Sequence, residues 1–110
     1  LDELIKNNLI KTQKISKTNR SGYYNFQILL NIKGKRDKFI KFLNSKNIQT
    51  SIHYTPCYEH QFYRNKFNTK YLVNTKKIFN NVVSLPLHNR LAFSDIDFIC
   101  SNILKFFKYL

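Results

Sequence analysis

The sequence predicts a mixed α/β fold of the α+β kind, in which helices cover a small three-stranded sheet. Apolar runs with strand character occur at residues 23–32, 48–52 and 81–87. Between and after them, apolar residues recur at helical spacing, over 36–46, over 68–80 and in the last segment of the chain. A chain of 110 residues with 43% hydrophobic residues can bury a core, so we expect one domain over residues 1–110.

The N-terminal third is expected to hold a helix end, a loop and a strand. Apolar spacing in residues 1–6 predicts the end of a helix that stops at Asn7 and Asn8. The stretch 11–22 is polar and turn-like, so we expect a loop there. Residues 23–32, YYNFQILLNI, are rich in aromatic and β-branched residues. This run predicts a strand whose second half is buried on both faces.

Residues 36–46 predict a helix with an apolar stripe of Phe39, Ile40 and Leu43. Asn47 can adopt the left-handed conformation that ends a helix, and Ile48 can then close back on Leu43 in a Schellman-type cap. A short strand is expected over 48–52. Strand directions stay open, although this helix could form the crossover of a right-handed βαβ unit.

The C-terminal third is expected to read helix, strand, helix. Residues 68–80 predict a helix with Asn68 as its N-cap and with apolar members Leu72, Val73, Ile78 and Phe79. The run NVVSLPL predicts a buried strand that ends at Pro86. Ser94 and Asp97 then resemble a capping box, with Asp in place of Glu. Apolar residues follow at helical spacing, namely Ile96, Ile99, Cys100, Ile103, Leu104 and Phe107.

The formal charge of +13 raises the prospect of an anionic partner. Lys is, however, scattered and abundant together with Asn, Ile, Phe and Tyr, which is what AT-rich codons produce. A basic binding module that contacts nucleic acid therefore stays an alternative, and nucleic acid is the less favoured partner. No apolar run approaches the roughly 18–20 residues of a membrane span, and no signal peptide is visible, so we expect a cytoplasmic protein without membrane partners.

Residues 51–67, SIHYTPCYEHQFYRNKF, hold two of the three histidines and one of the two cysteines. His53, Cys57 and His60 are spaced as His-x3-Cys-x2-His, which could suit zinc, but the four-ligand signature is incomplete. Cys57 beside an imidazole could be a nucleophile, although a small apolar side chain packed on the core is the simpler interpretation. With only two glycines, no glycine-rich phosphate loop exists. The sequence predicts no metal ligands, no catalytic residues and a binding loop between core elements.

Two segments resemble the small domain of DegT/DnrJ/StrS-type sugar aminotransferases. Residues 35–67 are similar to N-R-D-x-L-x-x-x-L-x-x-x-G-I-x-T-x-x-H-Y-x-P-L-H-x-x-x-x-Y-R, and residues 82–103 to V-L-S-L-P-L-H-P-x-L-T-D-x-x-V-x-x-V-x-x-x-I. The first pattern is matched by Arg36, Asp37, Phe39, Leu43, Ile48, Thr50, His53, Tyr54, Pro56, Tyr63 and Arg64. The second is matched by Val83, Ser84, Leu85, Pro86, Leu87, His88, Leu91 and Ile103. The two matches occur in the family's order and separation.

The resemblance implies the C-terminal small domain of a pyridoxal phosphate (PLP) enzyme of the aspartate-aminotransferase fold, fold type I. Residues 1–19 would be the end of an inter-domain helix and a loop, and residues 20–110 the small domain. The resemblance also implies transamination of nucleotide-linked keto-sugars by a homodimer, in amino-sugar and polysaccharide biosynthesis.

The family's Schiff-base lysine lies in a large domain, in the context S-x-H-x-x-K-x-x-x-x-G-E-G-G, which no lysine here shares. We therefore expect a fragment that binds no PLP and is not catalytic alone. A degenerate remnant of such an enzyme is a further alternative.

The resemblance places the 53–64 loop near the mouth of a sugar-nucleotide pocket. It implies that His53 and Tyr54 hydrogen-bond to or stack on the substrate, and that Arg64 faces its phosphate groups. Packing for Tyr54 and a solvent-facing position for Arg64 are the alternatives. Cys57 and Tyr58 stand where the family has Leu-His, so its second loop histidine is missing.

Overall fold

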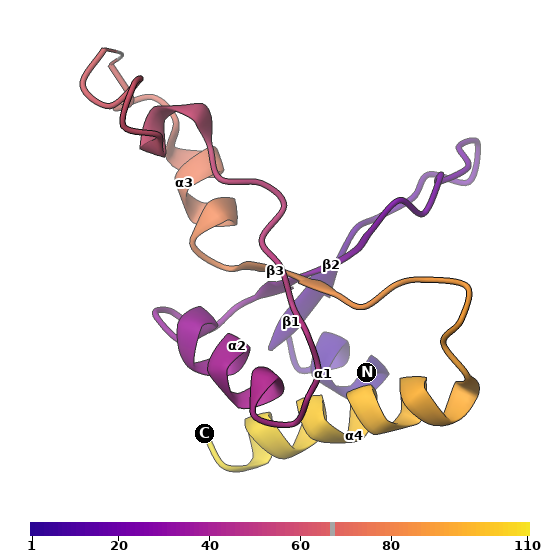
Figure 1. Ribbon diagram of the computed structural model, residues 1–110. Coiled ribbons are helices and arrows are strands. Elements are labelled where there is room, and N and C mark those ends of the chain that lie inside the picture. Colours follow the sequence, from indigo (N-terminus) through magenta and orange to yellow (C-terminus); the bar gives the residue numbers. More distant parts are fainter. Residues whose placement is uncertain (67) are drawn as a thin grey trace.

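The computed structural model, which describes residues 1–66 and 68–110, is a three-stranded antiparallel sheet with the helices at Asp2–Lys6, Arg36–Asn44 and Phe93–Lys108 on one face, while the helix at Val73–Phe79 projects away (Figure 1). The sheet order is β1-β2-β3. The elements, in chain order, are α1 (Asp2–Lys6), β1 (Ile10–Thr12), β2 (Phe26–Leu30), α2 (Arg36–Asn44), the 3-10 turn η1 (Cys57–Glu59), α3 (Val73–Phe79), β3 (Val82–Leu85) and α4 (Phe93–Lys108). The predicted class, a mixed α/β fold with a small three-stranded sheet, is confirmed.

One of the three strands is not where the sequence predicted it. Residues 10–12, at the edge of the expected loop, form β1 and pair with β2 in the register Ile10↔Leu30. Ile10 is fully buried, and this burial fixes a strand of only three residues. Tertiary packing here overrides a polar, turn-like local sequence.

The strand expected over 48–52 is reduced to one bridge, between Ser51 and Ser84. Ser51 runs antiparallel to β3, and β3 runs antiparallel to β2, so the chain at Ser51 is parallel to β2 with β3 between them. The crossover through α2 therefore joins parallel segments that are not neighbours. Ile48, at the start of the expected strand, instead enters the core at 3% exposure.

The predicted end of α2 is confirmed in detail. Asn47 has φ 60°, and the amide of Ile48 donates to the carbonyl of Leu43 at 3.0 Å. Asn47 also donates to the carbonyl of Asn44 at 3.0 Å, which completes the Schellman motif. Ile48 and Leu43 both belong to the buried core. The cap therefore directs the chain that follows α2 toward β3, with which it pairs at Ser51.

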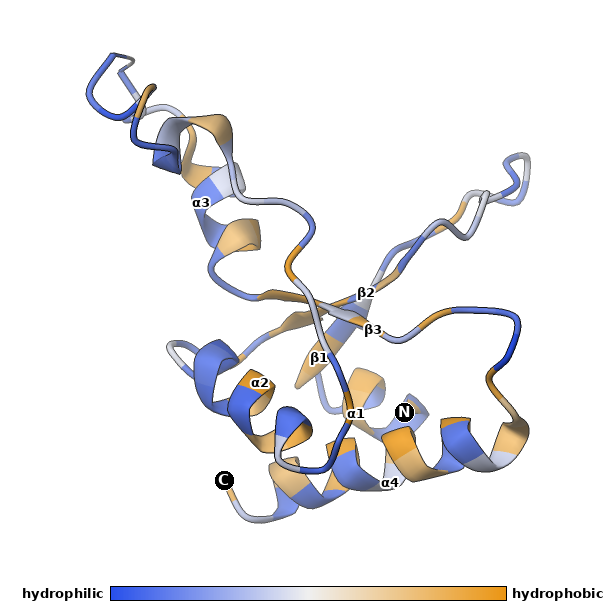
Figure 2. Cartoon of the chain, in the orientation of Figure 1, coloured by the Kyte–Doolittle hydropathy of each residue, from blue (hydrophilic) through white to orange (hydrophobic). Residues whose placement is uncertain are grey.

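The core lies between the sheet and helices α2 and α4. Alternate strand residues point into it, namely Ile28 and Leu30 of β2 and Val83 and Leu85 of β3, all of which are buried. Phe39 of α2 is fully buried, and its ring meets that of Phe106 edge-on at 5.0 Å. Figure 2 shows the hydrophobic residues of α4 concentrated on the side toward α2 and the sheet.

The first residues of the two C-terminal helices differ from the prediction: α3 begins later than predicted, and α4 begins earlier. α3 starts at Val73, none of its residues is buried, and Asn68 accepts from the amide of Lys70 instead of capping the helix. α4 starts at Phe93, and the carboxylate of Asp95 accepts from the amide of Ala92 at 2.9 Å. Neither Ser94 nor Asp97 caps it. No helix among the described residues is long and apolar enough to cross a membrane.

Candidate functional site

His53 is fixed by residues of β2 and β3. Its ring Nδ1 lies 2.8 Å from Oγ of Ser84, and its carbonyl accepts from Nε2 of Gln27 at 2.7 Å. Gln27 and Ser84 are paired in register, so they share the sheet face opposite the core. Ser84 is 3% exposed. Because Nδ1 is engaged, Nε2 is the ring atom left for a ligand, since it has no hydrogen bond to the described part of the chain.

Tyr54 continues this arrangement toward solvent. Its ring packs edge-on against that of His53 with centroids 4.7 Å apart, and its hydroxyl donates to the Tyr24 hydroxyl at 3.4 Å. That hydrogen bond raises the pKa of Tyr54 above its usual value. Both tyrosines are largely exposed, at 65% for Tyr54 and 82% for Tyr24. An exposed ring therefore stands beside His53, and the exposed ring of Tyr24 lines the same cavity.

A cavity of about 460 Å³ opens beside His53, at the end of β3. Its walls come from the chain after α2, the loop that follows β3 and the start of α4. The lining residues are Tyr24, Asn25, Asn47, Ile48, Gln49, Ser51, His53, Ser84, Leu85, Pro86, Leu87, His88, Leu91, Asp95 and Ile99. This volume and this mixture of apolar and polar walls suit a small molecule.

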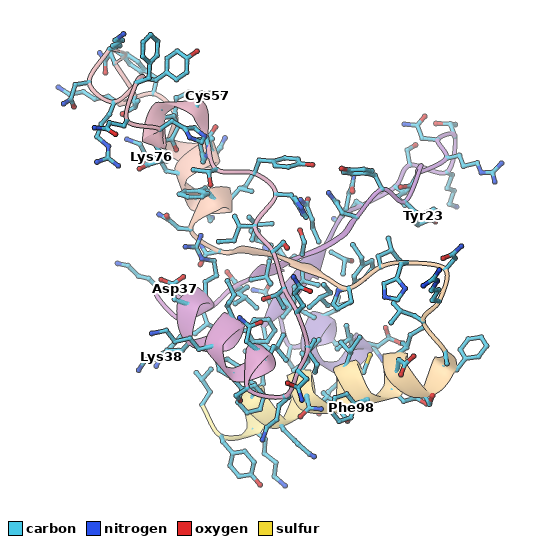
Figure 3. The ribbon with its side chains drawn as sticks, in the orientation of Figure 1. Tyr23, Asp37, Lys38, Cys57, Lys76 and Phe98 are labelled. Carbon is cyan, nitrogen blue, oxygen red and sulfur yellow. The ribbon has the colours of Figure 1, made fainter. Side chains whose placement is uncertain are left out.

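The three predicted binding residues are not all brought together. His53 lines the cavity, and Tyr54 stands next to it without lining it. Arg64 lies in the segment that projects from the sheet near Cys57, where its guanidinium donates to the carbonyl of Glu59 at 3.2 Å (Figure 3). The binding roles of all three stay predictions.

The pattern-based prediction did not single out Gln27 and Ser84 as site residues. Each is a polar residue within an otherwise apolar strand, FQILL for β2 and VVSL for β3. A polar side chain removed from water needs a hydrogen-bond partner, and His53 supplies it for the buried Ser84 and the half-buried Gln27. Polar interruptions at paired positions of neighbouring strands were thus the available signal.

The cysteines and histidines do not assemble a chemical centre. Among the described residues, no three His, Cys, Asp or Glu side chains lie close enough to hold a metal ion. Cys57 is an exposed free thiol, so the interpretation that it packs on the core is wrong. It lies in η1, which projects away from the sheet (Figure 3). Cys100 is also free and is half-buried on α4.

Comparison with known proteins assigns both fold and family. The family model described as the DegT/DnrJ/EryC1/StrS aminotransferase family matches residues 1–104. An uncharacterised protein of Methanocaldococcus jannaschii, MJ1066, is 30% identical over 99 residues, 86% of this chain and 26% of that protein. A Helicobacter pylori UDP-4-amino-4,6-dideoxy-N-acetyl-β-L-altrosamine transaminase is 30% identical over 69 residues, 63% of this chain and 18% of that protein.

Among solved structures, a Streptococcus pneumoniae protein described as a sugar aminotransferase, in its PLP form, superimposes with a TM-score of 0.80. The identity is 22%, over 92% of this chain and 27% of that chain. This likeness shows the fold. The chain thus spans about a quarter or less of the relatives it matches.

Proposed function

This chain belongs to the DegT/DnrJ/EryC1/StrS aminotransferase family, and we propose that it is the C-terminal, substrate-side domain of a PLP-dependent enzyme that aminates nucleotide-linked keto-sugars. The family and the UDP-sugar transaminase among its relatives support this assignment. On this proposal residues 20–110 form the small domain, and the complete enzyme is a cytoplasmic homodimer that serves amino-sugar and polysaccharide biosynthesis.

The observation that carries the proposal is the fixed His53 at the cavity beside β3. A nucleotide sugar presents hydroxyl and diphosphate oxygens, which accept or donate hydrogen bonds to an imidazole Nε2. The exposed rings of Tyr54 and Tyr24 offer a stacking surface for the base or the sugar. Arg64, on the projecting segment, would make a charge-assisted contact with the diphosphate if the ligand extends that far.

The cavity does not fit PLP itself. The cofactor needs a lysine for its Schiff base, and arginine is the side chain best suited to hold its phosphate group. No lysine or arginine lines this cavity in the described part of the chain, and the carboxylate of Asp95 is engaged in capping α4. We propose that a large domain holds the cofactor and that this chain supplies the facing wall of the substrate site.

The sheet face opposite the core supports a docking role for that large domain. A hollow of about 600 Å³ lies there, and its walls combine apolar residues, among them Ile5, Leu29, Ile78 and Val82, with polar ones that include Lys11 and Lys14. Ile5 and Ile78 are 40% and 52% exposed. Apolar surface of this kind is typical of an interface rather than of free solvent.

Ligand binding can be tested on the chain itself by NMR titration with UDP-N-acetylglucosamine as the probe. We expect millimolar affinity, with shifts at His53, Tyr24 and Ser84, and at least fivefold weaker binding by His53→Ala. His60→Ala is the matched control, because His60 is exposed and outside the cavity, and it should bind like the wild type. Equal binding by the wild type and His53→Ala would contradict the proposed site.

A further inference from the structure

The segment that follows His53 forms an arm, residues 54–66 and 68–79, which projects from the sheet and contains η1 and α3 (Figures 1 and 3). α3 has seven residues, and none of them is buried. An isolated helix shorter than about 12–15 residues is marginal in water, because nucleation is costly and few bonds repay it. Contacts with the rest of the molecule must therefore hold α3 in place.

Arg36, the first residue of α2, makes those contacts. Its Nη1 donates to the carbonyl of Phe79, the last residue of α3, and its guanidinium carbon lies 5.3 Å from the centroid of the Phe79 ring. Its Nε donates to the carboxylate of Asp37 at 3.0 Å. The Arg36 side chain is 15% exposed, whereas that of Asp37 is 76% exposed.

Each contact favours an ordered end of α3. A cation at a helix C-terminus interacts favourably with the helix dipole and satisfies a carbonyl that has no partner within the helix. Stacking over Phe79 adds a cation–π interaction that is partly shielded from water. The exposed pair with Asp37 contributes little energy and mainly orients the guanidinium fork.

The arm is thus held at both ends. Before it, His53 is bonded to Ser84 and Gln27, and at its far end Phe79 is bonded to Arg36. A further side-chain hydrogen bond between arm and body joins Tyr54 to Tyr24, and it is exposed. Beyond Phe79 the chain enters β3 at Val82, and the Asn81 carbonyl accepts from the amide of Leu30 at 2.9 Å, so loss of the Arg36 contacts would free α3 but not the chain that follows it.

We infer that Arg36 is a positioning residue, which latches the base of α3 to α2 and so sets where the 54–66 loop stands relative to the cavity. The latch is a property of the folded chain. Its consequence for ligand binding rests on the proposed function of the cavity. The two are tested separately, the first by local amide exchange and the second by affinity for a nucleotide sugar.

The latch is tested by amide hydrogen exchange, followed by NMR, in Arg36→Ala. We expect exchange of the α3 amides to accelerate at least tenfold, while the amides of β2 and α4 keep wild-type protection. Arg36→Lys should accelerate α3 nearly as much, because lysine keeps the charge but lacks the planar fork. Phe79→Leu removes the ring and keeps the carbonyl, so its effect should be smaller.

Arg20→Ala is the matched control, since Arg20 is exposed and has no side-chain partner in the described chain. It should leave α3 unchanged. Unaltered α3 exchange in folded Arg36→Ala would overturn the inference, as would equal acceleration in α3, β2 and α4, which would mean that Arg36 only stabilises the whole fold. If Arg36→Ala does not fold, the Arg36→Lys and Phe79→Leu variants decide by the same criterion.

Affinity for UDP-N-acetylglucosamine supplies the second measurement. With the latch lost, we expect Arg36→Ala to bind the probe several-fold more weakly, although Arg36 does not line the cavity. Faster amide exchange in α3 with unchanged affinity for the probe would confirm that Arg36 holds α3. It would also show that the position of the arm does not affect ligand binding. Absence of binding by the wild type would count against the proposed function, and the exchange rates alone would then decide whether the latch exists.

Discussion

Replacement of Ser84 by alanine removes the hydroxyl that holds the His53 ring. The distance from Ser84 Oγ to His53 Nδ1 is 2.8 Å, and because Ser84 is only 3% exposed, water does not compete for its hydroxyl. A net hydrogen bond contributes about 0.5–1.5 kcal/mol. His53 is half-buried, so water can reach its Nδ1 once the serine hydroxyl is gone. The loss of unfolding free energy should therefore be about 1 kcal/mol, below the larger cost of a buried polar atom without a hydrogen-bond partner. That corresponds to a fall of about 4 °C in Tm.

The assay is urea unfolding of a double-mutant cycle that combines Ser84→Ala with His53→Ala. The cycle isolates the pair from the packing that His53 also makes with Tyr54. We expect a coupling free energy of about 1 kcal/mol with unchanged m-values. Ser94→Ala, at an exposed helical serine, should change stability by less than about 0.5 kcal/mol. A coupling energy indistinguishable from zero would refute the idea that Ser84 orients the ring.

Three further predictions follow from single residues. Phe39→Ala should cost about 3–5 kcal/mol in urea unfolding, because the ring is fully buried, whereas Phe93→Ala, at 88% exposure, should cost under about 0.5 kcal/mol. Asn47→Ala should lose about 1 kcal/mol because of its φ of 60°, and Asn47→Gly should match or exceed the wild type in Tm. Tyr24→Phe should lower the Tyr54 pKa toward 10.0, seen by absorbance titration. The stability linked to that hydrogen bond is present below pH 10.0 and declines as pH rises through the raised pKa.

Local sequence determined those elements whose signals are complete within a few residues. The end of α2 is one, because Asn47, Ile48 and Leu43 together specify a left-handed residue and its closing contact. β3 is another, since a run of four residues buried on both faces and followed by Pro86 has few other conformations. The apolar spacing of α4 likewise fixed its presence, although not its first residue.

Only the tertiary structure decided which segments with an ambiguous local sequence pair as strands. Nothing in residues 10–12 distinguishes a strand from a loop until Ile10 is buried opposite Leu30. The run at 48–52 has the composition of a strand, but Ile48 is taken by the core and the chain leaves the sheet after Ser51. Sheet pairing is non-local, so its energy cannot be read from either segment alone.

The candidate site divides in the same way. The sequence, through its similarity to a family pattern, indicated His53, Tyr54 and Arg64 as binding residues, and the chain's membership in that family is now established by a match over residues 1–104. The structure alone revealed that Ser84 and Gln27 hold His53 and that Arg64 stands apart on the arm. The physical reason is distance along the chain. Residue types and local caps follow from neighbours in sequence, whereas the hydrogen bonds that orient His53 join residues 26 and 31 positions apart.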